Sequence, residues 1–151
     1  MRAVLGYLVM GLLAVSIPAA QSQTRINDKD VANLMHNLKE DAKKFNPMFN
    51  NAIKKSTIRK TSREKDAKNL VTTFAKQTEA MLNNFKRTKK ADSDFSLVKS
   101  SAAEIDKIVN DIKLDGEAAA MWQKIRTELD EVGSALRVSQ AAASCEQANR
   151  G

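Results

Sequence analysis

The sequence has only one cysteine, one histidine, two prolines and five glycines among its 151 residues. Without a second cysteine the chain cannot form an internal disulfide, so its stability has to come from packing. Cys145 is either an incidental free thiol, which we favour, or the site of a mixed or intermolecular disulfide. The few glycines and prolines leave too few breaks for the many turns of an all-β fold. These shortages favour a single helical domain.

The same shortages exclude several kinds of functional site. Zinc needs three or four His, Cys or carboxylate ligands, and covalently bound haem needs a C-x-x-C-H motif. A di-iron carboxylate bundle needs two E-x-x-H motifs, whereas His36 is the only histidine and falls off the main apolar stripe. The chain also lacks a G-x-S-x-G motif, a glycine-rich phosphate loop and paired carboxylates in an apolar setting. We therefore expect no enzymatic activity, no cofactor and no metal.

The N-terminal residues have the pattern of a secretory signal peptide. Arg2 is followed by an uncharged apolar run that extends to Pro18. Ala20 and Ser22 place small residues at positions −3 and −1 of a cleavage site. We predict that residues 1–22 are removed and that the mature chain is exported, to the periplasm or the extracellular space, without a transmembrane segment. Cleavage after Ala20 and an uncleaved signal anchor are the alternatives.

Four later segments space their apolar residues by three and four, as a helix with one buried face does. They cover approximately residues 27–53, 61–90, 92–112 and 115–136. The second and third connections are short, which favours antiparallel neighbours. We predict an all-α fold, an antiparallel up-down-up-down four-helix bundle spanning residues 27–137, followed by a flexible C-terminal tail, residues 138–151.

Several residues mark expected helix ends. Asn27 can cap the first helix, and Thr61 with Glu64 has the spacing of a capping box before the second. The acidic Asp92-Ser93-Asp94 run suits the start of the third helix, and Asp115 is the expected cap of the fourth. Each of these residues can satisfy an open backbone N–H group or favour the positive end of the helix dipole.

Two residues are unusual inside a helix. Pro47 removes a hydrogen bond to residue 43, so we predict a kink in the first helix, with two shorter helices as the alternative. Gly133 costs about 1 kcal/mol relative to Ala in a helix interior. A close approach of a neighbouring helix would explain why a glycine stands there.

Three core patterns carry a family resemblance. They are Phe74 to Phe85 with Thr78 and Leu82 between them, Ile105-Asp106, and Trp122-x-x-Ile125-Arg126-x-x-Leu129 with its Asp130-x-Val132 continuation. In these patterns the chain resembles an uncharacterised family of small exported bacterial helical-bundle proteins, over approximately residues 31–136. That family has no assigned activity, so the resemblance implies export and a helical fold only. Pro47 and the tail that holds Cys145 depart from the family pattern.

Two basic clusters are the candidate sites for contact with an anionic surface. The first is Lys54, Lys55, Arg59, Lys60 and Arg63, and the second is Lys86, Arg87, Lys89 and Lys90. In an up-down bundle they lie at opposite ends, whereas nucleic-acid binding requires a contiguous basic face, often with stacking aromatics. The clusters are either solvated helix ends or sites that attract anionic envelope polymers or lipid head groups. Without Arg2, 24 basic and 18 acidic residues leave a mature net charge of +6.

We interpret the chain as an exported, non-catalytic structural or interaction protein of the bacterial envelope. Its expected partner is an anionic surface or another protein, and no nucleic acid is expected. The alternative is a small-ligand or cofactor carrier with a pocket between the helices, lined by Met35, Phe45, Met81 and Trp122. Apolar stripes can also be exposed for a partner, but a closed core is favoured because monomers seldom expose large apolar patches.

Overall fold

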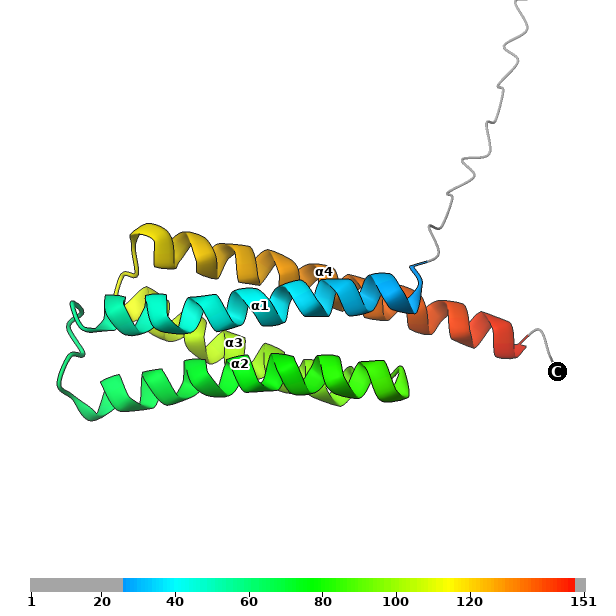
Figure 1. The fold of residues 1–151 in the computed structure, drawn as a ribbon, viewed down its shortest axis with the longest axis horizontal. Helices are drawn as coiled ribbons and strands as arrows, with labels where there is room; N and C mark the ends of the chain where they lie inside the picture. The colour runs from blue at the N-terminus through cyan, green and yellow to red at the C-terminus, as the bar shows by residue number, and fades with distance from the viewer. Residues whose placement is uncertain (1–25, 149–151) are drawn as a thin grey trace, which may run out of the picture.

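The described part of the chain consists of four α-helices. The computed structural model describes the backbone of residues 26–148 and the side chains of residues 26–139, so the predicted signal peptide and the Cys145 side chain lie outside it. The helices are α1 (Asp28–Ile53), α2 (Ser62–Thr88), α3 (Asp92–Asp111) and α4 (Gly116–Ala148), as Figure 1 shows. The predicted all-α four-helix fold is confirmed, and no strand occurs among the described residues.

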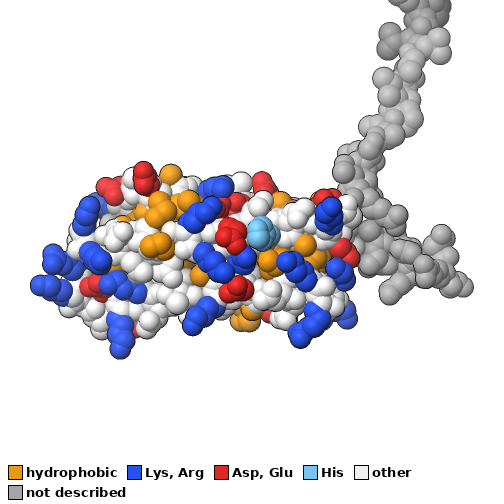
Figure 2. All heavy atoms as spheres, viewed as in Figure 1, with side chains coloured by type: hydrophobic (Ala, Val, Ile, Leu, Met, Phe, Trp, Pro, Cys, Tyr) orange, Lys and Arg blue, Asp and Glu red, His pale blue; other side chains and the backbone are white. Residues whose placement is uncertain are grey.

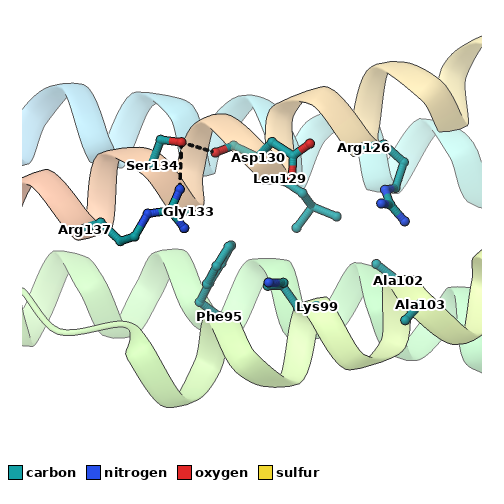
Figure 3. A pocket seen from close by; sticks show the side chains of 10 residues that line it. All are labelled: Phe95, Lys99, Ala102, Ala103, Arg126, Leu129, Asp130, Gly133, Ser134 and Arg137. Atoms are coloured by element: carbon teal, nitrogen blue, oxygen red, sulfur yellow. Dashed lines mark hydrogen bonds between the residues drawn. The ribbon is translucent and has the colours of Figure 1, made fainter.

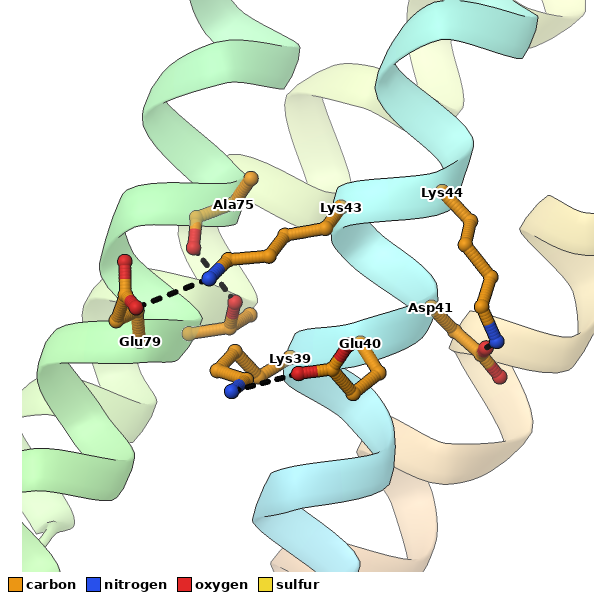
Figure 4. Close-up of polar contacts among 8 residues, drawn as sticks. Lys39, Glu40, Asp41, Lys43, Lys44, Ala75 and Glu79 are labelled. Carbon is orange, nitrogen blue, oxygen red and sulfur yellow. Dashed lines mark hydrogen bonds and ion pairs between the residues drawn. The ribbon is translucent and has the colours of Figure 1, made fainter.

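Polar contacts between helices give the direction of each neighbouring pair. Between α1 and α2, Lys43 reaches Glu79 (Figure 4) and Asn46 reaches Thr72, so the numbers rise in one helix as they fall in the other. The same relation holds between α2 and α3, where Asn84 contacts Asp94 near one end and Arg63 contacts Asp111 near the other. The chain reverses direction at each connection in Figure 1.

Packing around the bundle is uneven. α1 packs against both α2 and α4, and α2 packs against α3, whereas α3 and α4 make the smallest contact of the neighbouring pairs. The backbones of the diagonal pairs stay apart, although the Trp122 ring of α4 reaches the Phe74 ring of α2. One side of the bundle is therefore more open than the other three.

Aromatic side chains from three helices meet in the core. The Trp122 ring lies 5.1 Å from the Phe45 ring and 5.7 Å from the Phe74 ring, measured between centroids. Its indole N–H donates a hydrogen bond to Oδ1 of Asp106 at 2.8 Å, so burial leaves no polar atom of the indole unsatisfied. Trp122 is 1% exposed. The interpretation of Trp122 as a core residue is confirmed.

The helix starts differ in part from the predictions. Asn27 caps α1 as predicted, since its Oδ1 accepts a hydrogen bond from the Asp30 N–H at 3.0 Å. The capping box is wrong, because the Thr61 hydroxyl donates to the Ile58 carbonyl and Glu64 accepts from the Lys60 N–H instead. Lys60 has a left-handed backbone (φ 62°), and its N–H replaces the Thr61 N–H as the donor to Glu64, a shift of the donor by one residue.

Two further predictions concern Pro47 in α1 and the end of α4. α1 is one continuous helix with Pro47 inside it, so the alternative of two shorter helices is wrong, and the kink stays a prediction. Phe45 and Phe49 on either side of Pro47 are both fully buried, which shows that the apolar stripe keeps its phase. α4 continues to Ala148, beyond the predicted end of the bundle domain at residue 137. The flexibility of residues 138–151 stays a prediction.

None of the helices in the described ranges is both long enough and apolar enough to cross a membrane.

Candidate functional site

The first basic cluster is built on an ordered turn. Residues 54–61, here called the α1–α2 turn, are held by successive backbone hydrogen bonds, from Lys55 to Ala52 at 2.9 Å and from Thr61 to Ile58 at 3.2 Å. Ile58 is 6% exposed and packs into the core. Because the Ile58 side chain is buried in the core, the turn is held against the bundle and its basic side chains are exposed to solvent. Those exposed residues are Lys54, Lys55, Arg59 and Lys60.

The carboxylate nearest to this turn is already engaged at the start of α2. Glu64 pairs with Lys68 and also accepts a hydrogen bond from the backbone N–H of Lys60 at 2.6 Å. The Lys68 hydrogen bond, followed by that backbone N–H, lowers the pKa of Glu64 from its usual value. Glu64 therefore stabilises the helix start instead of forming an ion pair with a side chain of the turn.

The structure engages Arg63 in an ion pair, apart from the other residues of the first cluster, and places Lys113 beside those residues. Arg63 forms an ion pair with Asp111 at 2.7 Å, which ties the start of α2 to the end of α3. That contact brings the α3–α4 connection to the same end as the α1–α2 turn, and with it the exposed Lys113. Sequence reasoning missed Lys113, although the predicted antiparallel topology already places the first and third connections at one end.

We call Lys54, Lys55, Arg59, Lys60 and Lys113 the basic end. In Figure 2, Lys and Arg side chains gather at the end of the bundle that carries the α1–α2 turn. Within the described part of the chain, no ion pair to a carboxylate is formed by these five side chains. Their charges therefore act outward on the solvent or on a partner.

The second cluster lies at the opposite end and is followed in the sequence by acidic residues. Its members Lys86, Arg87, Lys89 and Lys90 are all exposed around the α2–α3 connection. The Arg87 guanidinium donates to Asn84 at 3.0 Å, and the Lys89 ammonium lies 5.7 Å from the Phe85 ring centre. The acidic first turn of α3 adjoins these cations in the sequence. α2 has 27 residues, so about 40 Å of helix separates the two clusters, as predicted for two separate caps.

A pair of carboxyl groups between α1 and α4, one buried (Asp41) and one half-buried (Glu128), was missed by the sequence analysis. Asp41 is 3% exposed and forms ion pairs with Lys44, at 3.1 Å (Figure 4), and with Lys124. Burial raises the pKa of Asp41, but hydrogen bonds from Lys124 and Lys44 outweigh it, and the net pKa is lowered. Burial, followed by the hydrogen bond with Asp41, raises the pKa of Glu128 to about 7.

The expectation of no paired carboxylates in an apolar setting is therefore wrong. The available signal was the position of Asp41, three residues after Leu38 and directly before Ala42 in the apolar stripe of α1. The pair lies in the packed interface between α1 and α4, where two lysines balance its charge. We interpret the pair as part of the packing between the two helices, because neither Asp41 nor Glu128 lines any of the described grooves.

The side chains proposed for a carrier pocket lie in the shared core. Met35, Phe45, Met81 and Trp122 are fully or almost fully buried. None of them lines the groove described below, which lies between α3 and α4. His36 is exposed, as predicted. Among the described residues, no group of three or more His, Cys, Asp or Glu side chains is arranged to hold a metal ion.

Comparison with known proteins yields no relative. No family model matches the sequence, and neither a curated protein nor a solved structure matches it. The resemblance to a family of small exported helical bundles therefore stays a prediction.

Proposed function

We propose that this chain is an exported, non-catalytic helical bundle of the bacterial envelope that binds an anionic surface through its basic end. Export rests on the signal-peptide pattern of residues 1–22. The anionic partner is supported by one observation, the ordered α1–α2 turn that holds four cations outward while the adjacent Glu64 is engaged elsewhere. The side chains of the alternative carrier pocket, Met35, Phe45, Met81 and Trp122, are packed in the core and are not proposed as a ligand site.

Electrostatics sets the expected strength of this contact. A Lys or Arg close to an anionic membrane surface contributes about 1 kcal/mol. Four or five such residues then supply about 4–5 kcal/mol, which corresponds to a dissociation constant near the millimolar range. Because the Debye length falls from about 10 Å at 0.1 M salt to about 3 Å at 1 M, binding should weaken strongly with salt.

Vesicle cosedimentation tests the proposal with a charge-matched control. The test variant combines Lys54→Gln, Lys55→Gln and Arg59→Gln, and the control combines Lys29→Gln, Lys76→Gln and Lys107→Gln, which are exposed elsewhere. On vesicles that contain phosphatidylglycerol, the test variant should lose about 3 kcal/mol, or about 100-fold in affinity, and the control far less. Purified peptidoglycan replaces the vesicles in a second arm, which distinguishes a polymer from lipid head groups.

Two results would count against the proposal. Equal losses in the two triple variants would mean that net charge alone, and not the basic end, drives association. Binding that is unchanged between low salt and about 1 M salt would exclude an electrostatic contact.

A further inference from the structure

The open side of the bundle contains a groove between α3 and α4. Its volume is about 250 Å³, and Figure 3 shows the side chains that line it from both helices. Phe95 and Ala102 of α3 and Leu129 and Gly133 of α4 form an apolar floor. At one end, Asp106 accepts a hydrogen bond from Trp122 and forms an ion pair with Arg126, which holds the two helices together there. The groove therefore lies next to the point where Asp106 of α3 is bonded to Trp122 and Arg126 of α4.

Small residues create this gap. Ala102 and Ala103 on α3 and Gly133 on α4 place short side chains where the helices face each other. A Cβ atom added at Gly133 would lie 2.8 Å from Cζ of Phe95, far closer than carbon atoms approach without strain. The glycine therefore allows the Phe95 ring to lie against the backbone of α4. This close approach gives the physical reason for a glycine inside α4.

The rim of the groove is cationic. Lys99, Arg126 and Arg137 line it, against a single carboxylate from Asp130. Arg126 is paired with Asp106. Among the residues whose side chains are described, Arg137 donates only to the Ser134 hydroxyl, at 3.1 Å, and the Lys99 ammonium lies 6.0 Å from the centre of the Phe95 ring. Two positive charges without a carboxylate partner in the described part of the chain therefore stand beside an apolar floor.

We propose that this groove binds a small carboxylate with an apolar ring or short chain. A guanidinium holds a carboxylate through two parallel hydrogen bonds, a role that Arg137 can take while Lys99 adds a second positive charge. A cavity of about 150 Å³ accommodates a benzene ring, so the larger volume here leaves room for the carboxylate as well. The apolar part of the ligand lies on Phe95 and Leu129. This site is separate from the basic end and does not depend on the function proposed for it.

Titration of the isotope-labelled protein with phenylacetate, followed by amide chemical shifts, tests the site. Phenylacetamide has the same shape without the charge, acetate has the charge without the ring, and hexanoate replaces the ring by a chain. Phenylacetate should bind at least about tenfold more tightly than phenylacetamide, since a hydrogen bond to a charged group contributes about 1.5–3 kcal/mol. The largest shifts should fall on Phe95, Lys99, Gly133 and Arg137. Comparison of phenylacetate with hexanoate shows whether the groove prefers a ring or a chain.

Matched variants separate this site from general anion attraction. Arg137→Gln should weaken phenylacetate binding about tenfold, whereas Lys107→Gln, an exposed lysine of α3 outside the groove, should leave it unchanged. Asp130→Asn should strengthen binding, because it removes the one carboxylate at the rim. Gly133→Ala should weaken binding without a change in charge, because the added methyl group and the displaced Phe95 ring occupy the groove.

Three outcomes would overturn the proposal. Phenylacetamide could bind as tightly as phenylacetate, or Lys107→Gln could weaken binding as much as Arg137→Gln. The shifts could instead concentrate on the basic end, which would mean that the anion is attracted by net charge. Amide spectra of each variant without ligand establish that its fold is retained.

Discussion

Trp122 is the residue on which the core depends most. Its ring contacts Phe45 of α1 and Phe74 of α2, and its N–H bonds to Asp106 of α3, so one side chain of α4 reaches all three other helices. Large aromatic side chains supply much of the apolar area that a small core buries. A single residue therefore links the four helices.

Replacement of Trp122 should be costly. Trp122→Ala should lower the free energy of unfolding by about 3–5 kcal/mol, because it leaves a large cavity in the core. Trp122→Phe keeps an aromatic ring but loses the hydrogen bond to Asp106, so its loss should be smaller. Urea unfolding followed by circular dichroism measures both variants. A loss below about 1 kcal/mol for Trp122→Ala would mean that the side chain is not buried.

The Asp41–Glu128 pair makes stability depend on pH, and each carboxyl acts in its own direction. The folded-state pKa of Glu128, about 7, lies above its ordinary value of 4.5. Its contribution is fully present below that ordinary value and is lost as the pH rises through 7. The pKa of Asp41 is lowered, so its contribution is present above its ordinary value and is lost as the solution becomes strongly acidic. Stability should therefore be greatest in mildly acidic solution.

A neutral isostere at position 128 tests this pH dependence. The free energy of unfolding should fall by about 2–3 kcal/mol between pH 5 and pH 8, as the shift of the Glu128 pKa requires. Glu128→Gln should remove most of this fall and be more stable than the unaltered protein at pH 8. Glu104→Gln, at an exposed carboxyl of α3, is the control and should retain it. Urea unfolding across this pH range gives the result, and identical profiles for all three proteins would contradict the assignment.

At the scale of the element, the end of α3 shows how a helix can stop without glycine. The Leu114 N–H donates to the Val109 carbonyl at 3.0 Å and the Lys113 N–H to the Asn110 carbonyl at 3.2 Å, the hydrogen-bond pattern of a Schellman motif. Lys113 takes the left-handed position of this motif, with φ of 50°. Leu114 then packs against the core. The apolar contact of Leu114 accompanies the turn although a lysine occupies the position that glycine usually takes.

A glycine at that position should stabilise the protein. Lys113→Gly relieves a left-handed conformation that costs a residue with a Cβ about 1–2 kcal/mol, less the entropy that glycine adds to the unfolded chain. We expect a net gain of about 0.5–1 kcal/mol. Lys107→Gly removes the same charge inside α3 and should instead lose about 1 kcal/mol. Thermal unfolding should move the two variants in opposite directions, and a loss for both would refute the strain at Lys113.

At the scale of the whole molecule, unequal helix packing divides the surface into different regions. α3 is the shortest helix, with 20 residues, and it faces α4 with alanines, so this side stays open. The α1–α4 and α1–α2 sides are packed with larger residues such as Phe45 and Phe49, and a second groove on the α1–α4 side is lined by Leu34 and Ala135. The proposed carboxylate groove and the proposed surface-binding end thus occupy separate parts of the bundle. Each can be altered by substitution without change to the other.

The sequence by itself determined four helices, their approximate limits except for the end of α4, and most residues of the core. This follows because a stripe of apolar residues with helical spacing has to be buried, wherever the helix finally lies. Trp122, Phe45 and Phe74 were all identifiable in this way. The basic residues of the α1–α2 turn were also identifiable, since a local run of charge at a connection is read directly from the chain.

Only the tertiary structure decided which residues meet across helices. The ion pair of Arg63 with Asp111, the proximity of Asp41 and Glu128, and the contact of Phe95 with Gly133 all join residues far apart in the chain. Such contacts depend on the rotation of each helix about its axis and on the axial offset between helices. Local spacing specifies neither quantity, because both follow from how large and small side chains interlock when the four stripes pack together.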